Sequence, residues 1–196
     1  AVINNTQLAN FMKLFMCRYS DVVNPEYLID DKTKKSVLSS YLNMYYRDKW
    51  SDETVEKNTK RFFMGIDVLP IEEKHLINTL NGNNEIINEK YHVSVKADGE
   101  RMIMFIKGDD RNVYLINSRL NVIVAGTSNQ SIEKGNYYVV DGELIEDHIM
   151  GKKMFLCIDI LYSKDADVRK NNFVERKELT QQFVQTIKIN GIQVSM

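Results

Sequence analysis

The residues best suited to chemistry lie in the hexad KADGER at positions 96–101. Its lysine, Lys96, follows an alternating apolar run that is typical of a β-strand. Asp98 and Gly99 then allow a sharp turn, and a glycine lets a phosphate come close to the backbone. Arg101 carries a fork of donors that can bind a phosphate or a ribose hydroxyl. The arrangement favours a covalent lysine nucleophile over the alternative of a solvated lysine at a strand end.

The parity of the predicted strand places Lys96 on the open side of a sheet. In a strand of period two, His92, Ser94 and Lys96 share one face. Val93 and Val95 then share the other face, and this apolar pair is expected to face the core. Lys96 therefore faces the open side with Ser94 beside it.

Acidic residues form the second part of the predicted site. Asp141 and Glu143 share strand parity at the end of the predicted strand that begins at Tyr137. Asp159 sits within the apolar run 155–161, where a charge must be paired or coordinated to be tolerated. Lysine, arginine and carboxylates around one cleft suit nucleotide chemistry, because a divalent metal held by carboxylates neutralises a triphosphate. A lysine attacks phosphorus only when it is neutral.

A sheet is needed to position these residues. The spacing of apolar residues along the chain changes after residue 84 from a helical to a strand-like pattern. Before it, apolar residues recur at helical spacing, and helices are predicted over 6–15, 37–45, from 51, and over 70–81. After it, runs alternate or are rich in β-branched residues, and the short turns between them imply antiparallel neighbours. Strands are predicted at 91–96, 102–107, 112–117, 121–124, 137–145 and 153–160, and a last helix at 174–187. The predicted fold class is α+β, with helices first and an antiparallel sheet after.

Composition bounds the function classes. The 196 residues carry a formal net charge of −1, so the overall charge does not demand a nucleic-acid partner, although it is compatible with a local basic cleft. Hydrophobic residues at 43% and charged residues at 27% are typical of a globular, water-soluble protein. No apolar run reaches the roughly 18 residues of a membrane span. Cys17 and Cys157 lie far apart in apolar patterns, which favours buried, reduced thiols of an intracellular protein.

Three motifs in family order resemble those of the covalent nucleotidyltransferases, which comprise mRNA capping guanylyltransferases and polynucleotide ligases. The hexad at 96–101 resembles their KxDGxR motif, and the run VDGEL at 140–144 resembles their third motif. The run at 155–162 resembles the FxxxDILY-like motif that follows, and NSR at 117–119 resembles the short basic element after the first hairpin. A single KxDG is a weak signal, whereas three motifs in order on predicted strands are a strong one. The resemblance covers about residues 91–180.

The resemblance implies a role for each site residue. Lys96 would form the lysyl-N-nucleoside monophosphate, Arg101 would contact the ribose, and Glu143 would bind the ribose or, through water, a metal. Arg119 would reach a phosphate or the RNA end, and a salt bridge is the alternative for it and for Asp159. The nucleotide-binding residues so implied are Ser94, Asp98, Gly99, Arg101, Arg119, Glu143 and Phe155. The implied metal ligands are Glu143 and Asp159, for Mg²⁺ or Mn²⁺.

Details of the motifs favour the capping branch. Ser94 stands two residues before the lysine, where ligases usually carry a glutamate. The DGEL form at 141–144 also resembles the capping branch, especially that of large DNA viruses such as baculoviruses. An aromatic residue that stacks on the base commonly precedes the acid of the next motif; here Ile158 stands there, with Phe155 and Tyr162 as candidates to replace it. The ER pair that ends the hexad is common in DNA ligases, so an ATP-dependent polynucleotide ligase is the alternative.

The resemblance thus implies an mRNA guanylyltransferase that passes GMP from GTP, through a lysyl-N-GMP intermediate, to the 5′-diphosphate end of RNA. Residues 1–84 are expected to be a helical N-terminal region or linker, and residues 85–196 the N-terminal part of an antiparallel-sheet nucleotidyltransferase domain of the ligase, ATP-grasp-like type. No lysine-x-lysine motif and no oligonucleotide-binding (OB) barrel follow, so the C-terminal part and the OB domain are expected to be missing. A truncated binding module within a transcription complex is a further alternative.

The resemblance also implies partners and a place in the cell. The expected partners are GTP, the RNA 5′ end and other subunits of a viral, RNA polymerase-associated capping complex, with no membrane. The expected location is the nucleus or cytoplasm of an infected host cell, with the nucleus favoured.

Overall fold

The computed structural model describes residues 29–46, 63–65, 70, 72, 92, 96–108, 110–129, 132–147 and 152–196. Two helices are described, α2 (Asp31–Tyr46) and α5 (Phe173–Thr186). The strands are β1 (Glu100–Lys107), β2 (Asn112–Asn117), β3 (Val122–Ser128), β4 (Tyr137–Asp147), β5 (Lys152–Lys164), β6 (Ala166–Asp167), β7 (Ile189–Asn190) and β8 (Gln193–Ser195). The helices predicted over 6–15, from 51 and over 70–81, and nearly all of the strand predicted at 91–96, lie outside the described residues.

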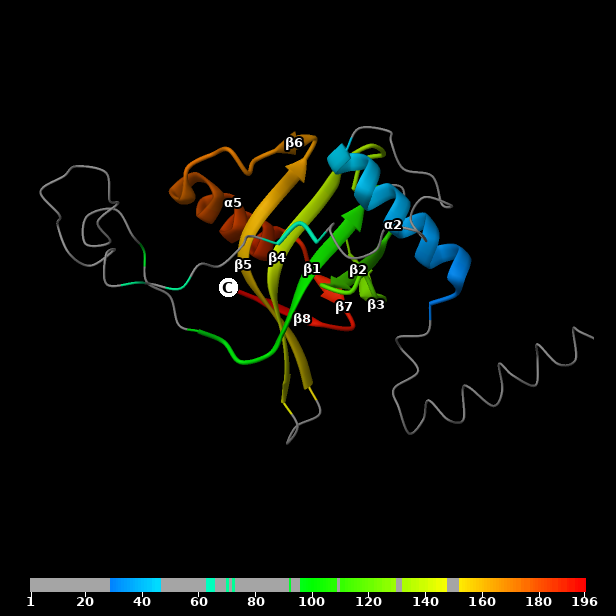
Figure 1. Ribbon diagram of the computed structural model, residues 1–196, viewed down its shortest axis with the longest axis horizontal. Helices are drawn as coiled ribbons and strands as arrows, with labels where there is room; N and C mark the ends of the chain where they lie inside the picture. Colours follow the sequence, from blue (N-terminus) through cyan, green and yellow to red (C-terminus); the bar gives the residue numbers. More distant parts are fainter. Residues whose placement is uncertain are drawn as a thin grey trace, which may run out of the picture.

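The strands form one sheet in the order β6-β5-β4-β1-β2-β3-β7, with antiparallel pairing along this path. The last strand, β8, pairs with β5 in the parallel sense, at Met154–Leu156 of β5. Figure 1 shows the long strands β1, β4 and β5 side by side at the centre of the molecule. The predicted α+β class with an antiparallel sheet is confirmed, and the parallel β8 is an addition that the sequence did not predict.

Helix α2 forms because its sequence offers both a start signal and an apolar stripe. The carboxylate of Asp30 accepts hydrogen bonds from the Thr33 backbone N–H at 3.0 Å and from the Thr33 hydroxyl at 2.6 Å, which satisfies an otherwise unpaired donor of the first turn. Val37, Tyr41 and their neighbours at 38 and 42 then recur at helical spacing and are buried. The helix predicted over 37–45 is therefore confirmed, and it begins six residues earlier, at Asp31.

Helix α5 begins with a reciprocal cap. The Asn172 side chain accepts a hydrogen bond from the Glu175 N–H at 3.0 Å, and its amide donates to the Glu175 carboxylate at 2.6 Å. Phe183 and Thr180 are its buried residues. The helix predicted at 174–187 is confirmed to within one residue at each end.

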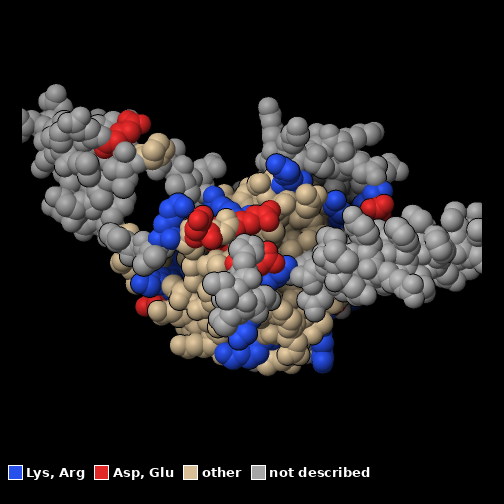
Figure 2. Space-filling model, turned by 90° about the horizontal axis from the view of Figure 1, so that it is seen from below, with Lys and Arg blue, Asp and Glu red and all other residues tan. Residues whose placement is uncertain are grey.

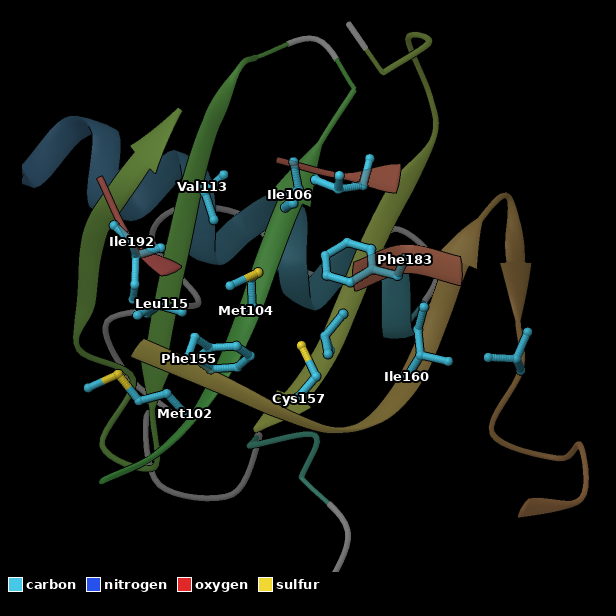
Figure 3. Packing of buried hydrophobic residues seen from close by; sticks show 14 residues of the cluster. Met102, Met104, Ile106, Val113, Leu115, Phe155, Cys157, Ile160, Phe183 and Ile192 are labelled. Carbon is cyan, nitrogen blue, oxygen red and sulfur yellow. The ribbon is translucent and has the colours of Figure 1, made fainter. Parts of the chain in front are cut away.

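The sheet separates two hydrophobic clusters. Alternation along β1 sends Met102, Met104 and Ile106 to one face, where Phe183 of α5 packs. It sends Ile103 and Phe105 to the other face, under helix α2. Figure 1 shows these two helices against different parts of the sheet, and Figure 3 shows the α5-side cluster from close by. Arg101 therefore lies near the start of a strand that is buried on both faces, and Lys96 precedes that strand by four residues.

One face of the described part of the molecule carries charged side chains of both signs. Figure 2 shows acidic and basic side chains interspersed on the face seen from below. None of the described helices combines the length and apolar character that a membrane span requires. Cys157 is buried, and burial raises the pKa of its thiol to about 12; Cys17 lies outside the described residues.

Candidate active site

The candidate site lies where the start of β1 pairs with the middle of β4. The two strands are antiparallel, and their register sets Arg101 opposite Glu143 and Ile103 opposite Asp141. Residues directly opposite in such a pair have Cβ atoms about 5 Å apart and point to the same face. Arg101, Asp141 and Glu143 therefore share the face on which helix α2 packs, although about 40 residues of chain separate β1 from β4 there.

Arg101 is held by a two-point ion pair with Asp141. Its Nε donates to Oδ1 at 3.1 Å and its Nη2 donates to Oδ2 at 2.6 Å. The Asp141 side chain is only 2% exposed, whereas that of Arg101 is 35% exposed. The buried carboxylate thus fixes the plane of the guanidinium, and the outer part of Arg101 faces solvent, where it can meet a ligand.

Gly99 and Glu143 form the second contact between the hexad and β4. The Gly99 N–H donates to Glu143 Oε1 at 2.8 Å. A Cβ at position 99 would clash with the backbone carbonyl oxygen of Leu144 and would lie 3.0 Å from Glu143 Cγ. Glycine is needed here because the turn approaches β4 closely; in the described structure that neighbour is the protein backbone.

Lys96 and Asp98 lie in the segment that leads into this contact. Both are exposed, and they precede β1 by four and two residues. The side chain of Lys96 is thus accessible from solvent, five residues before Arg101 in the chain. Ser94, the predicted neighbour of Lys96, lies outside the described residues.

Arg119 is brought to the same end of the sheet. It is exposed in the turn between β2 and β3, where its backbone N–H donates to Asn117 Oδ1 at 3.0 Å. The Asn117 amide in turn donates to Glu100 Oε1 at 3.1 Å, which joins this turn to the first residue of β1. Arg119 therefore stands near the hexad in the fold, across the β1–β2 pair.

Phe155 occupies a different place from the one the resemblance implied. It is fully buried and belongs to the cluster on the α5 side of the sheet. Figure 3 shows its ring among Met102, Met104 and Leu115. The structure gives Phe155 a packing role on the face opposite Arg101, so it is not retained as a contact to a nucleotide. Ile158, in contrast, is 46% exposed.

Asp159 has a protein partner. Its carboxylate, 4% exposed, accepts three hydrogen bonds from Arg176 of α5, at 3.0, 3.1 and 2.9 Å. The salt bridge that the sequence left open for Asp159 is thus present, and its two oxygens are engaged by a guanidinium rather than arranged for a metal. Within the described part of the chain, no three His, Cys, Asp or Glu side chains gather in a way that could hold a metal ion.

Two contributors to the site were not recognised in the sequence. The sequence identifies Asp141 as an acid near Glu143, but nothing in the spacing indicates that it pairs with Arg101. Phe63 was given no role, yet its ring lies against the Arg101 guanidinium, with 5.7 Å between Cζ and the ring centroid. Neither contact has a local sequence signal, because both depend on segments about 40 residues apart.

Comparisons with known proteins place this geometry in context. A family model described as "mRNA capping enzyme, catalytic domain" matches residues 49–196. Among solved structures, the ligase domain of LigD from M. tuberculosis matches with 14% sequence identity and a TM-score of 0.36. That match covers 50% of this chain and only 37% of the LigD chain. A comparison with curated proteins finds no match.

Proposed function

This chain belongs to the family of mRNA capping enzyme catalytic domains, and we propose that it is a guanylyltransferase that works through a covalent lysyl-N-GMP intermediate. Membership of the family indicates nucleotidyl transfer. One observation carries the finer proposal: exposed Lys96 leads directly into an arginine that a buried carboxylate holds in one orientation. An accessible amine and a preorganised cation are both needed for attack on a nucleotide phosphate.

The proposed reaction has two balanced steps. In the first, the neutral Lys96 amine attacks the α-phosphorus of GTP. A P–N bond forms, the P–O bond to pyrophosphate breaks, and the amine gives up a proton. In the second, an oxygen of an RNA 5′-diphosphate attacks the same phosphorus, the P–N bond breaks, and the lysine takes up a proton. GMP is thereby joined to the RNA.

The other residues keep the roles that the family resemblance implies, and their positions are compatible with these roles. Arg101 contacts the ribose through the exposed part of its guanidinium, while Asp141 holds the rest. Glu143 bonds to the Gly99 N–H through one oxygen, and among the described residues no other hydrogen bond to its carboxylate is found. Arg119 is placed to meet a phosphate or the RNA end. Nucleotide and RNA 5′ end are the proposed ligands, and other subunits of a viral capping complex in an infected cell are the proposed partners.

A divalent cation fits this site through Glu143 alone. A carboxylate oxygen is a hard donor of the kind that Mg²⁺ and Mn²⁺ take, and such ions keep waters and substrate phosphates as their other ligands. Asp159 does not fit as a second metal ligand, because its carboxylate is bound by the Arg176 guanidinium. When bound, the cation would neutralise the triphosphate and the charge on departing pyrophosphate.

Ile158 is proposed as an apolar floor under the base. Ile158 lies at a bulge in β5, between Cys157, which pairs with Gly142, and Asp159, which pairs with Asp141. Its side chain is 46% exposed, which is unusual for an isoleucine in a strand otherwise rich in buried residues. An aliphatic side chain can cover a purine without the stacking geometry of an aromatic ring.

Label transfer tests the proposal. The full-length protein is incubated with α-labelled GTP or ATP and Mg²⁺ or Mn²⁺, beside Lys96→Ala and a matched control, Lys134→Ala, which removes another exposed lysine. We expect an acid-labile adduct from GTP that is lost in Lys96→Ala and kept in Lys134→Ala. An adduct from ATP alone moves the protein to the ligase branch. No adduct from either nucleotide, with folded protein, leaves a binding module.

A further inference from the structure

A short segment far from the hexad in sequence lies directly on Arg101. The Phe63 ring packs on the guanidinium at 5.7 Å, and a Cβ at Gly65 would lie 2.9 Å from Arg101 Nη2 and clash with the Phe63 ring. The Phe63 ring and the Asp141 carboxylate therefore both contact the guanidinium. A side chain at position 65 would therefore have to displace the Phe63 ring or the Arg101 guanidinium.

This segment is attached to the body of the protein by packing and by a hydrogen bond, because Phe63 and Met64 pack against the cluster on the α2 side of the sheet. The Met64 backbone N–H donates to Tyr41 Oη at 2.9 Å. Tyr41 lies on α2, is completely buried, and packs edge-on against Phe105 with 5.7 Å between ring centroids. Phe105 lies on β1, four residues after Arg101 and on the same face. The hydroxyl thus connects the cover of Arg101 to the strand that carries Arg101.

Helix α2 precedes the segment that matches the capping-enzyme family model, which begins at residue 49. The residue that anchors the cover is therefore supplied from outside the matched region. This gives the helix a function at the site in addition to covering one face of the sheet.

We propose that Phe63 is a positioning residue for Arg101 and that the Tyr41 hydroxyl fixes Phe63 in place; this inference rests on the proposed function. An arginine side chain has considerable rotamer freedom, and Asp141 bonds to Nε and Nη2 of this one. An aromatic ring on the face adds an attraction of the cation–π kind and limits rotation out of the plane. The exposed donors of Arg101 are then presented to the nucleotide in one orientation.

Nucleotide binding measured without chemistry gives the first test. Fluorescent GTP is titrated into the full-length protein and into Phe63→Leu and Phe63→Tyr. Leucine keeps apolar cover but removes the ring, so we expect weaker binding by about two- to five-fold, the scale of an exposed cation–π contact. Tyrosine keeps the ring and should restore the original Kd. Equal Kd values for all three proteins would overturn the role of Phe63.

A matched pair of tyrosine variants tests the anchor. Tyr41→Phe removes only the hydroxyl that accepts from Met64, and Tyr114→Phe removes another buried hydroxyl on the same sheet face, which bonds to Asp110. We expect Tyr41→Phe to raise the Kd and the KM for adduct formation with little change in the maximal rate. Tyr114→Phe should leave both unchanged. Equal effects of the two variants would show general loosening and would overturn the inference.

The outcomes separate this inference from the proposed function. If the unaltered protein forms the adduct, and Phe63→Leu and Tyr41→Phe bind and react as it does, the positioning role fails while guanylyl transfer stands. If the unaltered protein binds nucleotide but forms no adduct, guanylyl transfer fails while the binding arm still decides the role of Phe63. If the unaltered protein binds neither GTP nor ATP, both proposals fail.

Discussion

Removing Arg176 should destabilise the fold strongly, because it would leave a buried carboxylate without its partner. The pair is enclosed: the side chains of Arg176 and Asp159 are 14% and 4% exposed. Breaking a buried pair from one side typically lowers the free energy of unfolding by about 3 to 5 kcal/mol. We therefore expect Arg176→Met to lose this amount, which is a large part of the stability of a typical domain.

The chain offers a control with similar bonding and different burial. Arg169 also binds an aspartate, Asp167, through Nε at 2.8 Å and Nη2 at 2.6 Å. Its side chain and that of Asp167 are 32% and 40% exposed. Solvent screening reduces the contribution of such a pair to about 0 to 1 kcal/mol, so Arg169→Met should have a small effect.

Urea unfolding followed by circular dichroism measures the difference. With a slope near 2 kcal/mol per molar, Arg176→Met should lower the midpoint by roughly 2 M, and Arg169→Met by less than about 0.5 M. Adding Asp159→Leu to Arg176→Met should recover most of the loss, because the uncompensated charge is then gone. Equal midpoints for the two arginine variants would refute the reasoning from burial.

Three further predictions concern single groups. Cys157 should resist alkylation at pH 8 until the protein unfolds, since burial raises its pKa to about 12; peptide mass mapping would check this, and rapid labelling of native protein would contradict it. Burial alone would raise the pKa of Asp110, but hydrogen bonds from Tyr114 and Asn112 outweigh it and lower that pKa below its ordinary value. The stability that ionised Asp110 contributes to the fold is therefore complete above about pH 4 and is lost as the pH falls further. The difference in unfolding free energy between the parent and Tyr114→Phe should narrow below that pH. A difference that stays constant with pH would contradict the reasoning. Gly99→Ala should reduce the yield of the covalent adduct several-fold while leaving most of the stability intact, because a Cβ there would push the turn off β4; unchanged label transfer would count against this role of the turn.

Local patterns predicted the main elements of the fold. The strand predicted at 112–117 is β2 as observed, and the helix at 174–187 is α5 shifted by one residue, because alternation and capping are both visible within a few residues. The strand at 121–124 was predicted too short, since Gly126 interrupts the pattern although β3 continues to Ser128. The short strands β6, β7 and β8 have two or three residues each, which is too few for any periodicity.

The candidate site could be predicted only as a set of residues, without their contacts. The motifs indicated Arg101, Gly99 and Glu143, and the register of β1 and β4 does bring these three together. Only the folded structure shows that Phe155 belongs to the cluster on the α5 side and that Asp159 binds Arg176. A bulge between Asp141 and Gly142 shifts the β4–β5 register, and such shifts cannot be read from alternation alone.

The contacts that join the hexad to β4 and anchor the Phe63 segment are long-range in sequence. Gly99 and Glu143 are 44 residues apart, Arg101 and Asp141 are 40 apart, and Tyr41 and Met64 are 23 apart. None of them can form in an isolated hairpin or helix, so loop-closure entropy must be overcome before any part of the site exists. The site therefore exists only when the whole sheet is folded. Nucleotide binding should raise the unfolding midpoint of the whole sheet, and a partly folded chain should bind no nucleotide.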